Sequence, residues 1–258
     1  MTQSMGIGQL IASLDLPTSS RVEERVPKKL LVENGAPTVA DKRHINEGIE
    51  EVQWLAALKP NTIGVPEYRD DVRDYLEIAV LSVTLRGSAK AGRLVELLHR
   101  AVPYPMVLLI AMQDRSLSLS LAHKRWSQGE TDKVVLDGAI VEVLLESQSS
   151  VPAIEEQFMQ ALALERQPRT TLYDLYQGWM DTLHALHAAR LTGIFAVSAT
   201  PDQASARRLA LQECRSLNGE ADRLQGLATK EKQLSRLVDL NLELKRVQAE
   251  LASAKERL

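Results

Sequence analysis

Residues 75–86 read YLEIAVLSVTLR, a nearly continuous apolar run of the kind found in strands that are covered on both faces. Gly87-Ser88 ends this run, and residues 91–102 then place leucines on one side of a predicted helix. A second apolar run, residues 106–112, predicts a buried strand after Pro103-Tyr104-Pro105. Strand, helix and strand in this order predict a helix laid across a sheet.

The residues that follow extend the predicted sheet. Residues 113–116 predict a turn, and residues 117–121 alternate leucine with serine, as in a strand that pairs with its neighbour across that turn. Two shorter strand candidates, residues 134–136 and 140–145, lie on either side of Asp137-Gly138. We therefore expect an α+β fold with a small mixed or antiparallel sheet and packed helices.

On the amino-terminal side of the apolar run, the pattern predicts two helices. A short helix is expected over residues 7–14 and is ended by Pro17. A longer helix, capped by Thr38 or Asp41, is expected to bury Trp54 as a core anchor. Its apolar residues recur every three or four positions, at Ile45, Ile49, Val52, Trp54, Leu55 and Leu58.

The carboxy-terminal half is predicted to be helical throughout and to end in a coiled coil. Helices are expected over residues 154–164, 172–191 and 203–217, followed by a final long helix. These patterns divide the chain into four predicted parts: an N-terminal segment (1–20), an α+β domain (21–150), a helical extension (151–200) and a long helix or coiled coil (201–258).

The end of the chain repeats apolar side chains at alternating spacings of three and four, which is typical of a coiled-coil seam. The seam residues are Leu237, Leu240, Leu244, Val247, Leu251, Ala254 and Leu258. An earlier phase, which ends at Leu234, shifts into this one and indicates a joint. We expect the seam to hold a second copy, with Asn241 favouring two strands, or a different partner. The alternative is a helix folded back on the chain's own helices.

Composition limits the classes of protein that the chain can represent. Hydrophobic residues make up 45% of the 258 positions and aromatic ones only 4%, so aliphatic side chains must fill the core. The net charge of -3 argues against a protein that coats nucleic acid by bulk charge. Cys214, the single cysteine, is interpreted as a bystander on a helix. His184 and His187 lack further metal ligands at suitable spacing, apart from Asp181.

The sequence predicts a cytoplasmic protein without membrane contact. Its amino terminus lacks the pattern of a signal peptide, and no apolar stretch reaches the ~20 residues that span a bilayer.

Local basic clusters are candidates for contact with nucleic acid. The cluster at residues 123–126 is the strongest, because it ends a strand where a loop would present it and Trp126 offers a face for stacking. The competing interpretation is a solvated surface, because acidic residues such as Glu23-Glu24 alternate with the basic ones. The candidate nucleic-acid-binding residues are Lys28, Lys29, Arg100, His123, Lys124, Arg125 and Trp126.

Signatures of catalysis are weak, and we predict no catalytic residue, no metal and no cofactor. A restriction-type nuclease places Glu-x-Lys or Asp-x-Lys on a strand that follows an acidic residue, and the strand after Glu77 carries neither. A site that combines Glu77 with His123 is the nuclease alternative. A structural arginine such as Arg86 or Arg100 is the simpler partner for a buried Glu77.

Five motifs occur in an order that resembles a bacterial family, the domain of unknown function numbered 4391. They are Val26-Pro27-Lys28-Lys29, Trp54 with the LAALKPNT of residues 55–62, Tyr75-Leu76-Glu77-Ile78, the RAVPYP of residues 100–105, and Ala122-His123-Lys124-Arg125-Trp126. The resemblance implies gene neighbours that encode a helicase-like ATPase and a DNA methyltransferase, as in restriction-modification-like loci for phage defence. It identifies no catalytic residue.

These observations lead to three hypotheses. The first is an accessory, non-enzymatic subunit of an anti-phage system, which docks the helicase or methyltransferase and contacts the partner or DNA. The second is a metal-dependent nuclease of such a system. The third is a homo-oligomeric scaffold joined by the predicted coiled coil.

Overall fold

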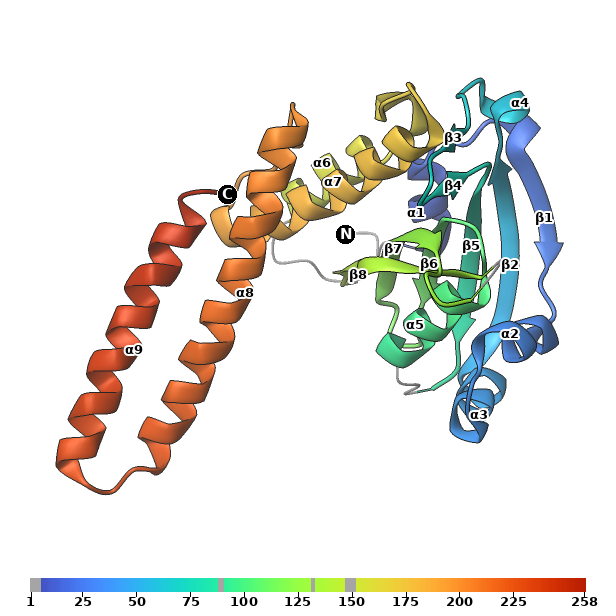
Figure 1. Ribbon diagram of the computed structural model, residues 1–258. Coiled ribbons are helices and arrows are strands. Elements are labelled where there is room, and N and C mark those ends of the chain that lie inside the picture. Colours follow the sequence, from blue (N-terminus) through green and yellow to red (C-terminus); the bar gives the residue numbers. More distant parts are fainter. Residues whose placement is uncertain (1–5, 88–90, 131–132, 147–151) are drawn as a thin grey trace. The chain divides into compact units, whose positions relative to one another are not determined.

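A mixed α+β architecture is observed in the computed structural model, which describes residues 6–87, 91–130, 133–146 and 152–258 (Figure 1). A six-stranded sheet has the order β1-β2-β5-β6-β7-β8. Its strands β5 and β6 are parallel, and the other neighbouring pairs are antiparallel. The strands are β1 (Arg21–Arg25), β2 (Ile49–Leu58), β5 (Ile78–Leu85), β6 (Met106–Ala111), β7 (Leu117–Trp126) and β8 (Val134–Leu145). The predicted α+β class is confirmed.

The chain divides into two compact units, the sheet unit (Met1–Leu183) and the hairpin unit (His184–Leu258). A small second sheet in the sheet unit pairs β3 (Tyr68–Arg69) with β4 (Asp74–Tyr75). The helices that begin in the sheet unit are α1 (Ile7–Ser13), α2 (Lys28–Gly35), α3 (Val39–Gly48), α4 (Pro60–Ile63), α5 (Ala91–Ala101), α6 (Pro152–Ala161) and α7 (Leu172–Thr192). In the described part of the chain, no helix is both long and apolar enough to cross a bilayer.

The strands predicted around residues 75–86 and 106–112 form the centre of the sheet. Six of the eight residues of β5 are buried, including neighbours in sequence, so both faces of this strand are covered. Helix α5 makes the crossover between the parallel strands β5 and β6, as the order of the sequence elements predicts. One core joins α2, α3 and α5 to the sheet through residues that include Leu31, Ile45, Val83, Leu94, Leu98 and Leu108.

The helix predicted to run from residue 38 to residue 58 is wrong beyond residue 48. Thr38 caps α3 as predicted, since its Oγ1 accepts from the Asp41 amide at 3.1 Å. The chain then turns into β2, which carries Trp54. β2 has irregular register between Ile49 and Glu51 and again before Ala56. Each bulge inserts an extra residue, so the buried positions Ile49, Val52 and Ala56 are three and four residues apart and imitate a helical spacing.

The two short strands predicted around Asp137-Gly138 form one strand, β8. Gly138 lies inside it with φ of +86°, a conformation that glycine adopts without a steric penalty. The paired strand β7 also changes register between Leu121 and His123. The glycine therefore marks an irregularity within one long strand and not a boundary between the two strands that the sequence predicts.

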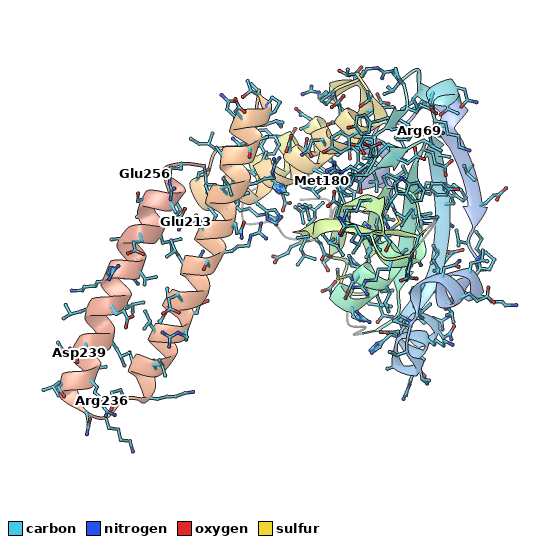
Figure 2. All side chains as sticks on the ribbon, in the orientation of Figure 1. Arg69, Met180, Glu213, Arg236, Asp239 and Glu256 are labelled. Carbon is cyan, nitrogen blue, oxygen red and sulfur yellow. The ribbon has the colours of Figure 1, made fainter. Side chains whose placement is uncertain are left out.

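In the hairpin unit, α8 (Pro201–Lys230) extends well beyond the helix predicted over residues 203–217, and α9 (Leu234–Lys255) forms the final helix. The break follows Lys230, where the Glu231 side chain accepts from the amides of Lys232 and Gln233, each at 2.8 Å. The two helices are antiparallel, since Arg257, just after α9, binds Glu213 in the first half of α8 at 2.7 Å. Figure 2 shows Arg236 and Asp239 near the turn and Glu213 and Glu256 nearer the open end.

The predicted seam packs inside this hairpin. Val247 and Ala254 are buried and the other five seam residues are half-buried. The facing residues of α8 include Leu211, Cys214 and Leu224, which are also buried. The heptad pattern therefore serves the fold-back alternative, and the shift of phase seen in the sequence marks the turn between two helices. A coiled coil between chains stays a prediction.

Close approach of α2 to α5 depends on Gly35. A Cβ atom at this position would lie 2.5 Å from the Cβ of Ala101 and 2.7 Å from the backbone oxygen of Leu97. The contact belongs to the core that covers the sheet, and no small movement of a flexible side chain can relieve it.

We expect Gly35→Ala to lower the free energy of unfolding by about 1–3 kcal/mol, because it overpacks the α2–α5 contact. Gly92→Ala is the matched control in α5, where an added Cβ meets no atom within 4 Å, and it should raise stability slightly. Urea unfolding followed by tryptophan fluorescence measures both changes, and equal effects of the two substitutions would contradict the packing argument.

Candidate functional site

The end of β7 carries four of the residues predicted to bind nucleic acid. Side chains alternate between the two faces of a sheet along a strand. Lys124 therefore reaches the face that α5 covers, and His123 reaches the face that α7 covers. The earlier residues of β7 are all buried, and their burial fixes the register of the polar residues that follow.

Lys124 is a buried cation at the carboxy-terminal end of α5. Its side chain is only 3% exposed, and Nζ donates to the backbone oxygens of His99 and Val102, the latter at 2.8 Å. These carbonyls have no partner within the helix, and the helix dipole favours a positive charge beside them. Burial lowers the pKa of Lys124 to about 7. Across residues 6–87, 91–130, 133–146 and 152–258, no carboxylate lies within ion-pair distance of Nζ.

His99 is the buried neighbour of Lys124. Its Nε2 lies 3.1 Å from Ser120 Oγ, and its Nδ1 has no hydrogen-bond partner among the residues described. Burial, with the charge of Lys124 as the second cause, lowers the pKa of His99 to about 3. The imidazole is therefore neutral at physiological pH and adds no charge to the site.

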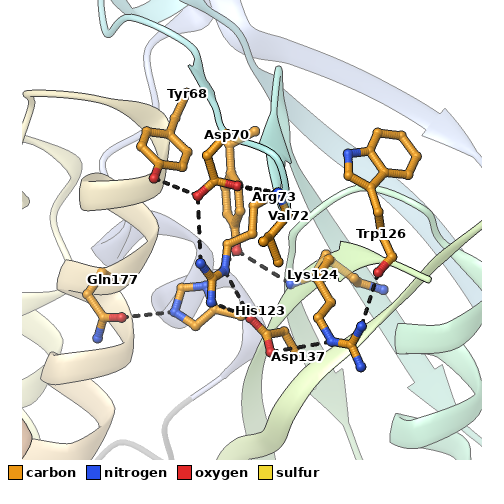
Figure 3. Close-up of polar contacts among 11 residues, drawn as sticks. Tyr68, Asp70, Val72, Arg73, His123, Lys124, Trp126, Asp137 and Gln177 are labelled. Carbon is orange, nitrogen blue, oxygen red and sulfur yellow. Dashed lines mark hydrogen bonds and ion pairs between the residues drawn. The ribbon is translucent and has the colours of Figure 1, made fainter. Parts of the chain in front are cut away.

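His123 belongs to a hydrogen-bonded chain on the other face of the sheet (Figure 3). Its Nε2 lies 2.9 Å from Gln177 Oε1, an oxygen that can only accept, so Nε2 carries the proton. Nδ1 then accepts from the Tyr75 hydroxyl, and Gln177 donates onward to Asp181 at 2.9 Å. These hydrogen bonds join β4, β7 and α7. The polar residues that form them therefore have a structural role.

Arg73 joins the small sheet to the same face of the large one. Its guanidinium contacts Asp137 of β8 at 2.7 Å and lies 5.7 Å from the ring centroid of Tyr173. Tyr68 stacks on Tyr173 with a centroid separation of 5.0 Å. Asp137 also pairs with Arg125 at 3.7 Å. The side chains of this cluster therefore bind one another, and their contacts attach the β3–β4 sheet to β8 and α7.

On the α5 face, a pocket of about 590 Å³ is lined by four basic residues, Arg100, Lys124, Arg125 and Lys133. We call it the basic pocket. The loop after α2, the end of α5 and the β7–β8 connection supply its walls. Glu33 also lines it, and this carboxylate pairs with Lys29 at 3.7 Å. Cations in a concave site attract anions, because surrounding protein reduces the screening by water.

A smaller pocket of about 220 Å³ shares Lys124 and Arg125 with the basic pocket. Tyr104 and Trp126 line it, and we call it the aromatic pocket. Tyr104 is 41% exposed and Trp126 is 38% exposed, so both rings are partly open to solvent. Asp74 contributes a carboxylate to the same wall. Together the two pockets place cations beside exposed aromatic rings.

The structure brings some of the predicted residues together and separates others. Arg100, Lys124, Arg125 and Trp126 line the two pockets, whereas His123 lies on the opposite face of the sheet. Lys28 donates to the backbone oxygens of Asn46 and Ile49, at the end of α3. Lys29 is exposed and pairs with Glu33.

Glu77, the acid of the nuclease alternative, has a different partner from the one predicted. Its carboxylate binds Lys59 Nζ at 3.0 Å, so the prediction of Arg86 or Arg100 is wrong. Lys59 directly follows β2, which pairs with β5 next to Glu77. Because the sequence predicted a helix in place of β2, this pairing of Lys59 with Glu77 could not be predicted. Glu77 and His123 take separate partners. The described residues include no cluster of three or more His, Cys, Asp or Glu side chains arranged to hold a metal ion.

Sequence reasoning missed several residues that shape the site. Lys133 and Tyr104 line the pockets, and Arg73 and Asp137 fix the neighbouring strands. Proline on both sides of Tyr104 was a usable signal, since it holds the ring in a loop where exposure is common. The pairing of Arg73 with Asp137 joins residues far apart in sequence, and only the register of β7 and β8 brings them together.

The comparison with family models agrees with the resemblance seen in the motifs. The family described as "Domain of unknown function (DUF4391)" matches residues 14–251. The chain belongs to this family. The match extends over both units and includes the pockets and most of the hairpin. No curated protein and no solved structure matches the chain.

Burial of Lys124 predicts a particular dependence of stability on pH. The pKa of about 7 in the folded chain lies below the ordinary value of 10.5, so the unfolded chain binds more protons between these values. The free energy of unfolding of the native protein should therefore rise with pH across this window, relative to Lys124→Met, by up to about 1.4 kcal/mol per pH unit.

Tryptophan fluorescence during urea unfolding reports on the sheet unit, because Trp54, Trp126 and Trp179 all lie in it. Lys29→Met, which removes an exposed lysine, is the matched control and should leave the slope unchanged. Parallel curves for the native protein and Lys124→Met would contradict the buried-ammonium interpretation.

Proposed function

We propose that the protein is an accessory, non-enzymatic subunit of a bacterial anti-phage system of the restriction-modification type. In this proposal the hairpin unit docks a helicase-like ATPase or a DNA methyltransferase, and the sheet unit contacts nucleic acid. Membership of the family supports the proposal through the gene neighbourhood that the resemblance implies. The observation that carries it is a second apolar stripe on α9.

This stripe lies outside the seam that holds the hairpin together. Leu234, Val238 and Leu242 are spaced four residues apart, so they lie on one face of α9. They are 76%, 49% and 62% exposed, whereas the seam residues are buried or half-buried against α8. A helix that exposes a row of large apolar side chains beside a filled seam is typical of a docking surface.

The charges around the stripe indicate the chemistry of the partner. Lys230, Lys232 and Arg236 are exposed at the same end of the hairpin. Glu231, which lies among them, turns its carboxylate toward backbone amides. A partner surface with an apolar centre and an acidic rim would complement this end, because opposite charges at a rim speed association and exclude wrong partners.

We predict that the chain co-purifies with the helicase-like ATPase or the methyltransferase encoded beside it, and that Leu234→Ser with Val238→Ser and Leu242→Ser weakens this binding at least tenfold. The loss follows from removing apolar area from the centre of the interface. Affinity chromatography of co-expressed proteins, followed by a titration with the purified partner, measures it.

Leu209→Ser is the matched control, because Leu209 is a leucine of similar exposure (65%) on α8 and lies outside the stripe. Circular dichroism should show equal helix content in all variants. Binding that survives the triple substitution, or absence of any complex with either partner, would contradict the proposal. Light scattering of the chain alone tests the scaffold hypothesis, since a stable dimer that the triple variant abolishes would assign the stripe to self-association.

A further inference from the structure

The two pockets at the end of α5 are neighbours that share lining residues, and we call the pair the composite cavity, with the basic pocket as its cationic part and the aromatic pocket as its aromatic part. Lys124, Arg125 and Val134 line both pockets and so form their common wall. A ligand that spans this wall would meet ammonium and guanidinium groups on one side and the rings of Tyr104 and Trp126 on the other. The arrangement matches a molecule with an anionic group beside a flat apolar one.

Lys124 is the buried amine of this cavity, and its pKa of about 7 lets a bound anion favour its protonated form. A protonated amine has three donors, and the carbonyls of His99 and Val102 accept two of them. The third donor has no partner in the described part of the chain, although the side chain is almost fully buried. A buried charge without a counter-ion is costly, and an anion in the adjoining pocket would supply the missing partner.

The remaining cations lie at the rim and can be redirected. Arg100 pairs with Glu96 at 2.7 Å and Lys133 pairs with Glu130 at 2.7 Å, whereas the guanidinium of Arg125 is directed to Asp137 in the cluster on the His123 face. Ion pairs between exposed side chains contribute little to stability, so Arg100 and Lys133 can exchange a carboxylate for a ligand phosphate at low cost. Arginine binds phosphate through two parallel hydrogen bonds, which adds orientation to attraction.

The shape of the cavity favours a single strand over a duplex. In a double helix the bases are stacked and paired, so a concave site can touch only phosphates and groove edges. In a single strand, a base can leave its neighbours and stack on an aromatic side chain while its phosphate binds nearby cations. The exposed rings of Tyr104 and Trp126 are otherwise unexplained by the packing of the core.

We infer that the composite cavity binds one nucleotide unit of a single-stranded nucleic acid, with its phosphate in the basic pocket and its base in the aromatic pocket. The inference names the kind of nucleic acid and rests on the nucleic-acid contact in the proposed function. Neither pocket includes residues of the hairpin stripe, so strand binding and partner docking can fail independently.

The test is fluorescence anisotropy with the full chain alone, using a labelled oligothymidylate, a mixed-sequence duplex of equal length and thymidine monophosphate as a competitor. We expect the single strand to bind at least tenfold more tightly than the duplex. Trp126→Ala should weaken strand binding by about tenfold, the effect of losing one stacked base. Arg100→Ala combined with Lys133→Ala should weaken it and reduce its salt dependence, because both residues line the basic pocket.

Lys42→Ala combined with Arg43→Ala is the matched control, because it removes two exposed cations that line neither pocket. This variant should bind the strand as the native chain does. All the substituted side chains lie at the surface or rim, and the emission of Trp54 and Trp179 verifies folding in the Trp126 variant. Tighter binding of the duplex overturns the inference. So does binding of the mononucleotide alone, or equal affinity of native chain and pocket variants.

Discussion

The buried amine of Lys124 joins β7 to the end of α5, because its Nζ donates to the carbonyls of His99 and Val102. It satisfies helix carbonyls that would otherwise be buried without partners, and it attaches the crossover helix to the strand beyond it. Helix α2 then packs on α5 through the close approach at Gly35. The loop after α2 and the end of α5 in turn form walls of the basic pocket, so one buried charge connects the fold to the site.

The last residues of β7 divide two roles between the faces of the sheet. On the α7 face, His123 bonds to Tyr75 and Gln177 while Arg73 pairs with Asp137, and these contacts hold strands and helix together. On the α5 face, Lys124 has a hydrogen-bond donor to spare beside a cavity. A run of polar residues in one strand can thus be structural at one position and available to a ligand at the next, because neighbouring side chains point in opposite directions.

The sequence predicts best the elements whose periodicity is undisturbed. The apolar runs of β5 and β6 and the leucine face of α5 have regular spacing, and all three are observed. β2 was predicted as a helix because two bulges change its spacing, and β8 was split in two because Gly138 resembles a turn residue. The site is harder to predict, since the pairing of Glu77 with Lys59 and the position of Lys133 depend on register between strands. The terminal heptads specify an apolar surface, and the turn after Lys230 decides that α8 covers it.

The most direct test of the central claim is the titration of the Lys124 side chain by nuclear magnetic resonance, with ¹³C-labelled lysine and with Lys124→Met to assign its signal. We predict a pKa of about 7 for Lys124 in the free protein and a clear rise when an oligothymidylate is added, because a phosphate stabilises the protonated amine. An ordinary lysine pKa in the free protein, or a pKa that the oligonucleotide leaves unchanged, would contradict the account.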